Sequence, residues 1–286
     1  MRIVLVSVLM IAVILSNRAY LSAILNDSNN SDSGIHVIIK PEFESYLLNQ
    51  SVWIMIVIYN DSGKPYKLVQ PIEGFAVRFD ITDPNNDKIS SLYGEHNYLE
   101  MDSVYLREND SIKNFICLDY YMQSSRQLRN KQTGDYRIKA IYQGLESNTL
   151  IINVKYPIGD DEELFNQTYG AYYPISNDKQ VVKLEGLLKT YNESPYCPQL
   201  YNWLLTATID QKDTSRYFKN VQNFFDNNSN SFGTIFILDS YLAYLGTTLN
   251  LNPDQIDQRK SELKLKYNNT FIKKCLDNDN YRITKK

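Results

Sequence analysis

Histidine and cysteine, the residues that most often bind metals or supply nucleophiles, are scarce in this sequence. There are two histidines and three cysteines in 286 residues, and they lie far apart, at His36, His96, Cys117, Cys197 and Cys275. No two of them have the CxxC, HxxxH or HExxH spacing that brings metal ligands together. We therefore expect neither a metal nor another cofactor.

Catalysis by a Ser-His-Asp arrangement would have to use one of the two histidines. His36 lies in an apolar run that predicts a strand and His96 in a turn-like segment, so neither belongs to a recognisable nucleophile motif. The acidic run at residues 160–163 could supply paired carboxylates or calcium ligands. It stands directly before two apolar residues, where acids favour the first turn of a helix, and it lacks the EF-hand spacing. We therefore expect a protein that is not an enzyme.

Tyrosine is the residue type that stands out in the composition, with 23 copies. A tyrosine ring offers a large rigid surface with a polar tip, which suits sugar stacking and protein contact. An AT-rich genome, which supplies Tyr and Asn together, explains the same excess without a binding role. The two densest clusters provide the candidate binding residues, namely Tyr120, Tyr121, Tyr169, Tyr172 and Tyr173.

Charge and composition favour a globular protein that does not capture nucleic acid. The chain has 30 Lys and Arg against 33 Asp and Glu, and it contains no long basic run. With 43% hydrophobic and 22% charged residues it can bury a core, and its length predicts two domains.

The amino terminus has the pattern of a secretory signal peptide. Arg2 precedes an uncharged apolar run over residues 3–16, which is shorter than the roughly 20 residues that span a membrane as a helix. An uncleaved anchor and a buried first strand are the alternatives. We expect a signal peptide or anchor over residues 1–23, a polar linker over residues 24–34, and export to the periplasm or the extracellular space. Any membrane contact would then be made by this segment alone.

Export permits disulfides, but three cysteines cannot all pair. Cys117 lies in an apolar run and is most simply a buried thiol. Cys197 and Cys275 both lie in the carboxy-terminal half and are the candidate disulfide, with three unpaired thiols as the alternative.

N-x-S/T triplets, the acceptor motif for N-linked glycans, recur along the chain. Such triplets arise by chance in an Asn-rich sequence and matter only if the host glycosylates secreted proteins. Beyond the polar stretch at residues 24–34 they begin at Asn49, Asn60, Asn109, Asn166, Asn192, Asn227 and Asn268.

Residues 35–156 have the pattern of an antiparallel β-sandwich. Short runs of β-branched and aromatic residues alternate with polar turn clusters, and no helical pattern separates them. Residues 136–142 show the alternation directly, with Tyr136, Ile138, Ala140 and Tyr142 on one face. The predicted strands cover residues 35–39, 52–59, 66–69, 75–82, 98–106, 112–118, 136–142 and 150–154.

Four phrases within this region, at residues 59–62, 79–83, 134–140 and 147–154, carry a resemblance to known domains. Together they resemble bacterial extracytoplasmic immunoglobulin-like domains, and they are similar to the β-sandwich of bacterial intracellular proteinase inhibitors. The resemblance implies a sandwich, and through the second family it implies proteinase inhibition. The leader is a departure from an intracellular inhibitor.

From about residue 158 the apolar period becomes that of helices. The pattern predicts a helical hairpin across residues 179–209, with Ser194 as N-cap and Pro195 as the first residue of its second helix. Further helices are predicted from about 214, around 238–245, and from Asn252-Pro253, whose capping-box partner is Gln255. These starts recur at a spacing typical of helical repeats.

The phrase at residues 191–196 resembles the hairpin corner of tetratricopeptide-like repeats in bacterial envelope proteins. The resemblance implies a helical hairpin domain over residues 157–286, of which a tetratricopeptide-like solenoid is the more specific form.

The sequence thus predicts a multidomain β + α fold, an immunoglobulin-like sandwich followed by a helical hairpin domain. The expected function is that of an exported binding protein whose partner is a protein or a glycan of the cell envelope. The alternatives are an inhibitor of a secreted proteinase and, more remotely, a hydrolase with an unrecognised site.

Overall fold

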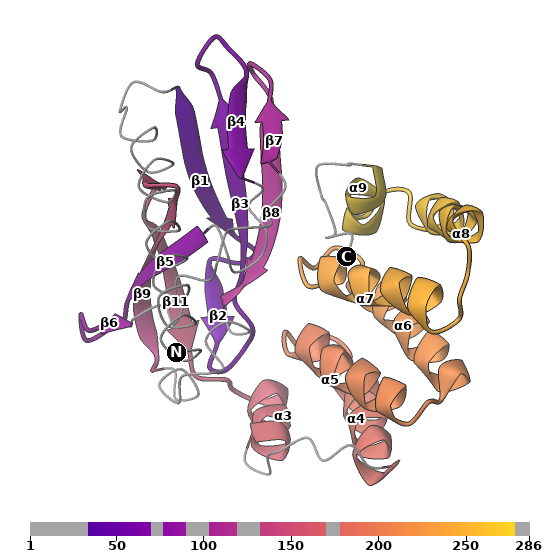
Figure 1. Ribbon diagram of the computed structural model, residues 1–286. Helices are drawn as coiled ribbons and strands as arrows, with labels where there is room; N and C mark the ends of the chain where they lie inside the picture. Colours follow the sequence, from indigo (N-terminus) through magenta and orange to yellow (C-terminus); the bar gives the residue numbers. More distant parts are fainter. Residues whose placement is uncertain (1–33, 70–76, 90–102, 119–131, 170–177, 278–286) are drawn as a thin grey trace, which may run out of the picture. The chain divides into compact units, whose positions relative to one another are not determined.

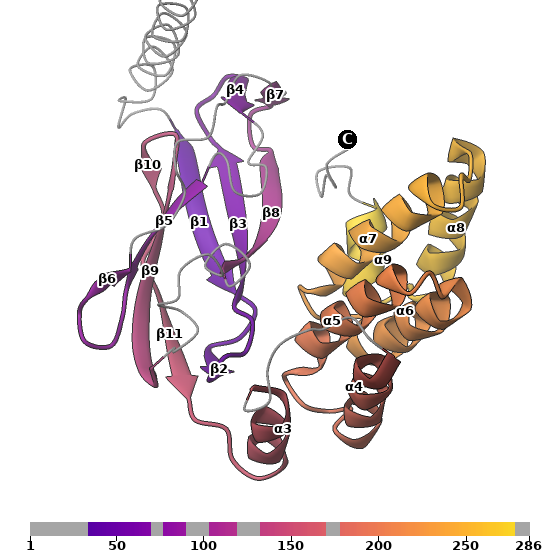
Figure 2. The ribbon, with the colours of Figure 1, turned by 60° about the horizontal axis from the view of Figure 1, so that its bottom comes forward.

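The computed structural model describes residues 34–69, 77–89, 103–118, 132–169 and 178–277. Strands occupy the first part of the chain and helices the second, so the fold is a mixed β and α fold (Figures 1 and 2). The predicted signal peptide at residues 1–23 lies outside the described residues. Of the polar linker, only Gly34 lies within them.

The strands follow the predicted pattern, with short additions. They are β1 (Ile35–Pro41), β2 (Ser45–Leu47), β3 (Trp53–Asn60), β4 (Tyr66–Val69), β5 (Val77–Thr82), β6 (Lys88–Ile89), β7 (Ser103–Leu106), β8 (Ser111–Cys117), β9 (Gly134–Tyr142), β10 (Leu145–Glu146) and β11 (Leu150–Lys155). Among the described residues they pair in three sheets, ordered β1-β3-β8, β2-β11-β9-β5-β6 and β4-β7, with β10 added to β9. Pairing is antiparallel in the β5–β9, β5–β6, β9–β10 and β4–β7 ladders, and parallel between β2 and β11.

Alternating side chains explain why these segments are strands. In β9 the predicted inward residues Tyr136, Ile138, Ala140 and Tyr142 are all buried, which confirms the predicted face. At β1, the side chain of Asn148 takes the place of a neighbouring strand. Its Oδ1 accepts from the backbone N–H of Ile39 at 2.8 Å and its Nδ2 donates to the carbonyl of Ile39 at 3.2 Å.

The described helices are α3 (Asp160–Tyr169), α4 (Asp178–Thr190), α5 (Cys197–Asp210), α6 (Thr214–Asn228), α7 (Thr234–Thr247), α8 (Pro253–Lys266) and α9 (Phe271–Asp277). The predicted start of α8 is confirmed, because Asn252 and Gln255 form both hydrogen bonds of a capping box beside Pro253. The predicted start of α5 is wrong. The helix begins two residues later, at Cys197, with Tyr196 as its N-cap, while the hydroxyl of Ser194 donates to Asp161 Oδ1 at 2.6 Å and accepts from the backbone N–H of Tyr196 at 3.3 Å.

The chain divides into two compact units. The first contains residues 1–40, 56–114 and 137–150, and the second contains residues 41–55, 115–136 and 151–286. The division passes through strands β1, β3, β8, β9 and β11. Strand gives way to helix between Lys155 and Asp160, as the sequence predicts. The domain boundary near residue 156 stays a prediction.

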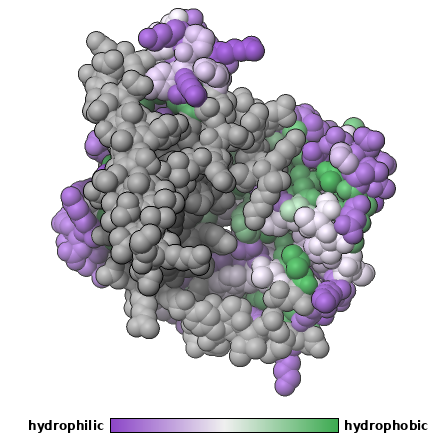
Figure 3. Space-filling view, in the orientation of Figure 1, coloured by the Kyte–Doolittle hydropathy of each residue, from purple (hydrophilic) through white to green (hydrophobic). Residues whose placement is uncertain are grey.

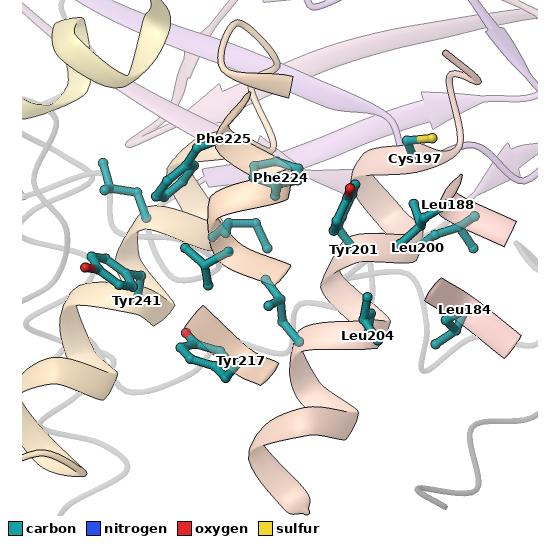
Figure 4. Packing of buried hydrophobic residues seen from close by; sticks show 14 of the residues in the cluster. Leu184, Leu188, Cys197, Leu200, Tyr201, Leu204, Tyr217, Phe224, Phe225 and Tyr241 are labelled. Atoms are coloured by element: carbon teal, nitrogen blue, oxygen red, sulfur yellow. The ribbon is translucent and has the colours of Figure 1, made fainter. Parts of the chain in front are cut away.

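The helices of the second unit share an aromatic core. Phe224 and Phe225 of α6 are fully buried, and Tyr201 of α5 meets Phe224 edge-on with ring centroids 5.4 Å apart (Figure 4). Apolar side chains of α4, among them Leu184 and Leu188, fill the other side of α5. Helix-spaced apolar residues therefore account for the packing of α4, α5 and α6.

One ion pair joins α4 to α6 above this core. Glu185 accepts two hydrogen bonds from Arg216, at 2.8 and 2.7 Å, and a third from Asn220 Nδ2 at 3.2 Å. These bonds hold the pKa of Glu185 below its ordinary value of 4.5, with the Arg216 hydrogen bonds as the largest cause.

The lowered pKa predicts a pH dependence of stability. Because the folded state favours the carboxylate, the stabilisation is present at neutral pH and is lost as pH falls below about 4.5 through the lowered pKa of the folded state. Replacing Glu185 with glutamine should lower the free energy of unfolding at pH 7 by about 1.5–3 kcal/mol and by less at pH 3. Urea unfolding at the two pH values measures this difference.

Glu262 provides the matched control, because its ion pair with Arg259 is more exposed. Glu262→Gln should change the free energy of unfolding by less than about 1 kcal/mol at either pH. Equal effects of the two substitutions at pH 7 would contradict the account of the Glu185 pair.

Candidate functional site

Of the five candidate binding tyrosines that the sequence provides, the described residues include Tyr169 alone. Tyr120, Tyr121, Tyr172 and Tyr173 lie outside the described residues. Tyr169 is the last residue of α3. The binding role of all five tyrosines therefore stays a prediction.

The segment between β11 and α3 exposes two large side chains. Tyr156 is 49% exposed and Ile158 is 80% exposed, while Pro157 between them is buried. Gly159 has a φ of +61°, a conformation that costs glycine little, and its carbonyl accepts from the backbone N–H groups of Glu162 and Glu163. Proline and glycine thus fix the path of the chain from strand to helix and turn Tyr156 and Ile158 outward.

A row of aromatic rings holds Tyr156 in place. Its ring centroid lies 6.0 Å from that of Phe165 on α3, and Phe165 lies 6.3 Å from Tyr196. Tyr196 is fully buried, and its hydroxyl donates to the carbonyl of Leu48 at 2.6 Å. All these residues belong to the second unit. The exposed ring is therefore anchored through its neighbours to a fixed point in the core.

The acidic run occupies the first turn of α3, as the sequence predicts. Asp161 accepts from Ser194, and Gln167 donates to Glu163 Oε1 at 3.1 Å and to the Tyr191 hydroxyl at 3.3 Å. Burial, followed by the nearby Glu163 carboxylate, raises the pKa of Tyr191. The result is an aromatic and aliphatic patch with an anionic border, which we call the α3 surface and define by Tyr156, Ile158, Phe165 and the carboxylates of residues 160–163.

Exposed apolar residues also occur elsewhere, and they serve as comparisons. On the helices, apolar residues reach the surface among polar ones (Figure 3). Leu265 of α8 is 80% exposed, as much as Ile158, and Tyr105 of β7 is 68% exposed. The α3 surface differs in that an exposed tyrosine and an exposed isoleucine lie two residues apart on one anchored segment.

The cysteines correct a prediction. Cys197 and Cys275 are free buried thiols, so the disulfide between them that the sequence allows is not formed. Cys197 donates to the carbonyl of Tyr191 at 3.0 Å. Burial raises the pKa of the Cys197 thiol to about 11 and that of Cys275 to about 12, so neither thiol ionises at neutral pH. Cys117 is buried as well, as predicted.

His36 is in a strand, as predicted, but its neighbours do not form a nucleophile site. Its Nε2 lies 3.1 and 3.0 Å from the two carboxylate oxygens of Asp61, and its ring stacks near Tyr59. The adjacent Ser62 hydroxyl donates to Asn60 Oδ1 at 2.7 Å and to the carbonyl of Lys64 at 2.9 Å. Both of these hydrogen bonds of the Ser62 hydroxyl are to groups other than the His36 imidazole. His96 lies outside the described residues.

The described residues contain neither a cluster of metal-binding side chains nor a membrane-spanning helix. In that part of the chain, no three His, Cys, Asp or Glu side chains are grouped so that they could hold a metal ion. Nor does any helix within it have the length and apolar character needed to cross a membrane.

Comparison with known proteins leaves the family open. No protein-family model and no curated protein sequence matches the chain. Among solved structures, similarity extends to the alkylpurine DNA glycosylase AlkC of Pseudomonas fluorescens (10% identity, 43% of this chain and 31% of that one, TM-score 0.27). It extends also to a β-glucosidase of Listeria innocua (11%, 43% and 16%, TM-score 0.28) and to Spo0M, a sporulation control protein of Bacillus subtilis (8%, 46% and 54%, TM-score 0.27). The chain spans about half of Spo0M and a third or less of the two enzymes, and at these TM-scores none of the likenesses carries an argument.

Proposed function

We propose that the protein is an exported binding protein without enzymatic activity, and that it contacts a protein or envelope component through the α3 surface. In this proposal the strands form an immunoglobulin-like sandwich and the helices a hairpin domain of tetratricopeptide-like kind. The single observation that carries the binding role is the exposure of Tyr156 and Ile158 on an anchored segment.

Anchoring matters because binding costs the entropy of the side chains that it immobilises. A ring already packed against Phe165, which itself contacts the buried Tyr196, loses less freedom on binding than a solitary exposed tyrosine. Aromatic residues with large contact area and a polar tip dominate the affinity at many interfaces. Tyr156 has both properties.

The negative charge at the border of the α3 surface limits the kinds of partner that can bind there. Four consecutive carboxylates at residues 160–163 begin within four residues of Tyr156. Such a field repels polyanions, so nucleic acid and anionic lipid are poor partners for this surface. A neutral or basic protein surface, or an uncharged glycan, fits better.

The experiment is a capture assay with matched variants. The purified protein is immobilised, and envelope fractions of the source organism are passed over it. Replacing Tyr156 and Ile158 together with serine should lower retention of the captured component by at least about 30-fold, the equivalent of a hot spot of about 2 kcal/mol.

The control replaces Tyr105 and Leu265 with serine, which removes a similar pair of exposed side chains from β7 and α8. This variant should retain the component fully, and circular dichroism should show that both variants are folded. Equal retention by both variants would contradict the α3 surface. Inhibition of a secreted proteinase by the purified protein would instead favour the inhibitor function.

A further inference from the structure

The N-x-S/T triplets are more frequent than the composition explains. Nine begin in the chain, counting Asn26 and Asn29 outside the described residues, and the chain has 29 Asn and 36 Ser or Thr. At that frequency of hydroxyl residues, 29 asparagines give about four triplets by chance. The number of triplets in the chain is therefore about twice the number expected by chance.

The structure sorts the seven described acceptors into distinct environments. Asn60 is fully buried, and its side-chain amide donates to the carbonyls of Lys64, Leu106 and Arg107. Asn49 is half-buried. Asn166 and Asn227 are exposed but lie within helices α3 and α6, in the last turn of each.

The remaining three acceptors are exposed and lie in turns. Asn109 joins β7 to β8 with a φ of +61°, Asn192 lies between α4 and α5, and Asn268 lies between α8 and α9. A glycosyltransferase must bind the acceptor segment in an open conformation, and exposed turns allow this. At Asn109 it requires the release of two hydrogen bonds, one from its backbone N–H to the Asn60 carbonyl at 2.7 Å and one from the Tyr59 hydroxyl to its Oδ1 at 3.2 Å. These three positions also occur in both compact units.

We propose that Asn109, Asn192 and Asn268 are N-glycosylation sites and that Asn60 is not. The Nδ2 of each acceptor attacks C1 of a lipid-linked oligosaccharide diphosphate. The bond from C1 to the phosphate oxygen breaks, and its electron pair leaves with the lipid diphosphate. The N–C1 bond forms, and the amide proton passes to a base of the transferase. The inference rests on the export part of the proposed function, because such donors and transferases act on secreted chains.

The test uses the full chain behind a cleavable leader in a eukaryotic secretory host that supplies the donor. The secreted, folded fraction is digested and its glycopeptides are mapped by mass spectrometry. We expect glycans on Asn109, Asn192 and Asn268, and an unmodified Asn60. Replacing the three turn asparagines with glutamine should remove three glycan masses from the intact protein.

Absence of glycan from all three turn sites in the secreted protein would overturn the inference, and so would a glycan on Asn60 in folded protein. Because the leader is supplied, this outcome does not depend on where the chain resides in its own source. The capture assay for the α3 surface is run separately, on the variant in which all three turn asparagines are replaced with glutamine. Failure of the binding proposal is therefore distinguishable from failure of the glycosylation proposal.

Discussion

Replacing Phe224 with alanine is expected to lower the free energy of unfolding by about 3–5 kcal/mol. Phe224 is fully buried on α6, with Tyr201 of α5 edge-on at 5.4 Å and Phe225 at 6.0 Å (Figure 4). Alanine would remove most of the buried side chain and leave a cavity at the centre of the helix packing. The midpoint of urea unfolding, followed by circular dichroism at the helical signal, measures the effect.

Tyr105→Ala is the control for this experiment, because it removes an aromatic ring that is 68% exposed. Its effect should stay below about 0.5 kcal/mol. If Phe224→Ala were as mild as Tyr105→Ala, the core described for the helices would be wrong.

Replacing Asn60 with aspartate is expected to be almost as damaging, at about 3 kcal/mol or more at pH 7. The Nδ2 of Asn60 donates to three carbonyl oxygens at 2.9, 2.9 and 3.1 Å, while its Oδ1 accepts from the backbone N–H and the hydroxyl of Ser62. In aspartate an oxygen would face those three carbonyls, and a negative charge would be buried with only the neutral donors of Ser62 beside it.

The sign of the pH effect follows from this placement. Protonating the new carboxyl removes the charge and restores one donor, so Asn60→Asp should recover part of its stability between pH 7 and pH 4. The matched control is Asn223→Asp, at an exposed position on α6, which should stay within about 0.5 kcal/mol of the parent at pH 7. Thermal and urea unfolding of both variants at the two pH values decide the matter. Equal stabilities at pH 7 would rule out the proposed role of Asn60.

Local sequence patterns predicted the helices and strands that are long enough to show a regular spacing of apolar residues. The alternation in β9 and the Asn252-Pro253 start of α8 are confirmed because the governing contacts lie within a few residues of each other. β2 could not be found in this way. It is three residues long, and its pairing partner β11 runs parallel to it about a hundred residues later in the chain.

Ser194 combines a local contact with a tertiary one. Its Oγ accepts from the backbone N–H of Tyr196 at 3.3 Å, as the Oγ of an N-cap serine does, and its hydroxyl also donates to Asp161 of α3, 33 residues earlier, while α5 begins at Cys197. A local reading of the sequence contains no information about that partner.

The sequence predicted the position of the four acids in a helix, but it predicted neither the acids nor the aromatic residues as a binding surface. Residues 160–163 lie in the first helical turn as expected. Local sequence does not identify Tyr156 and Ile158 as a surface, because what makes them one is their anchoring through Phe165 to Tyr196, which lies 40 residues beyond Tyr156. The available signal was the pair of large apolar residues flanking a proline in an otherwise polar stretch.

The most direct test of the α3 surface is photo-crosslinking from the position of Ile158. A photoreactive phenylalanine analogue is placed there in one variant and at Leu265, which is equally exposed, in another. Both variants are mixed with the envelope fraction and irradiated. If the α3 surface binds the partner, we expect a crosslinked product of one defined mass from position 158 and none from position 265. Crosslinking from position 265 alone, or equally from both, would contradict it.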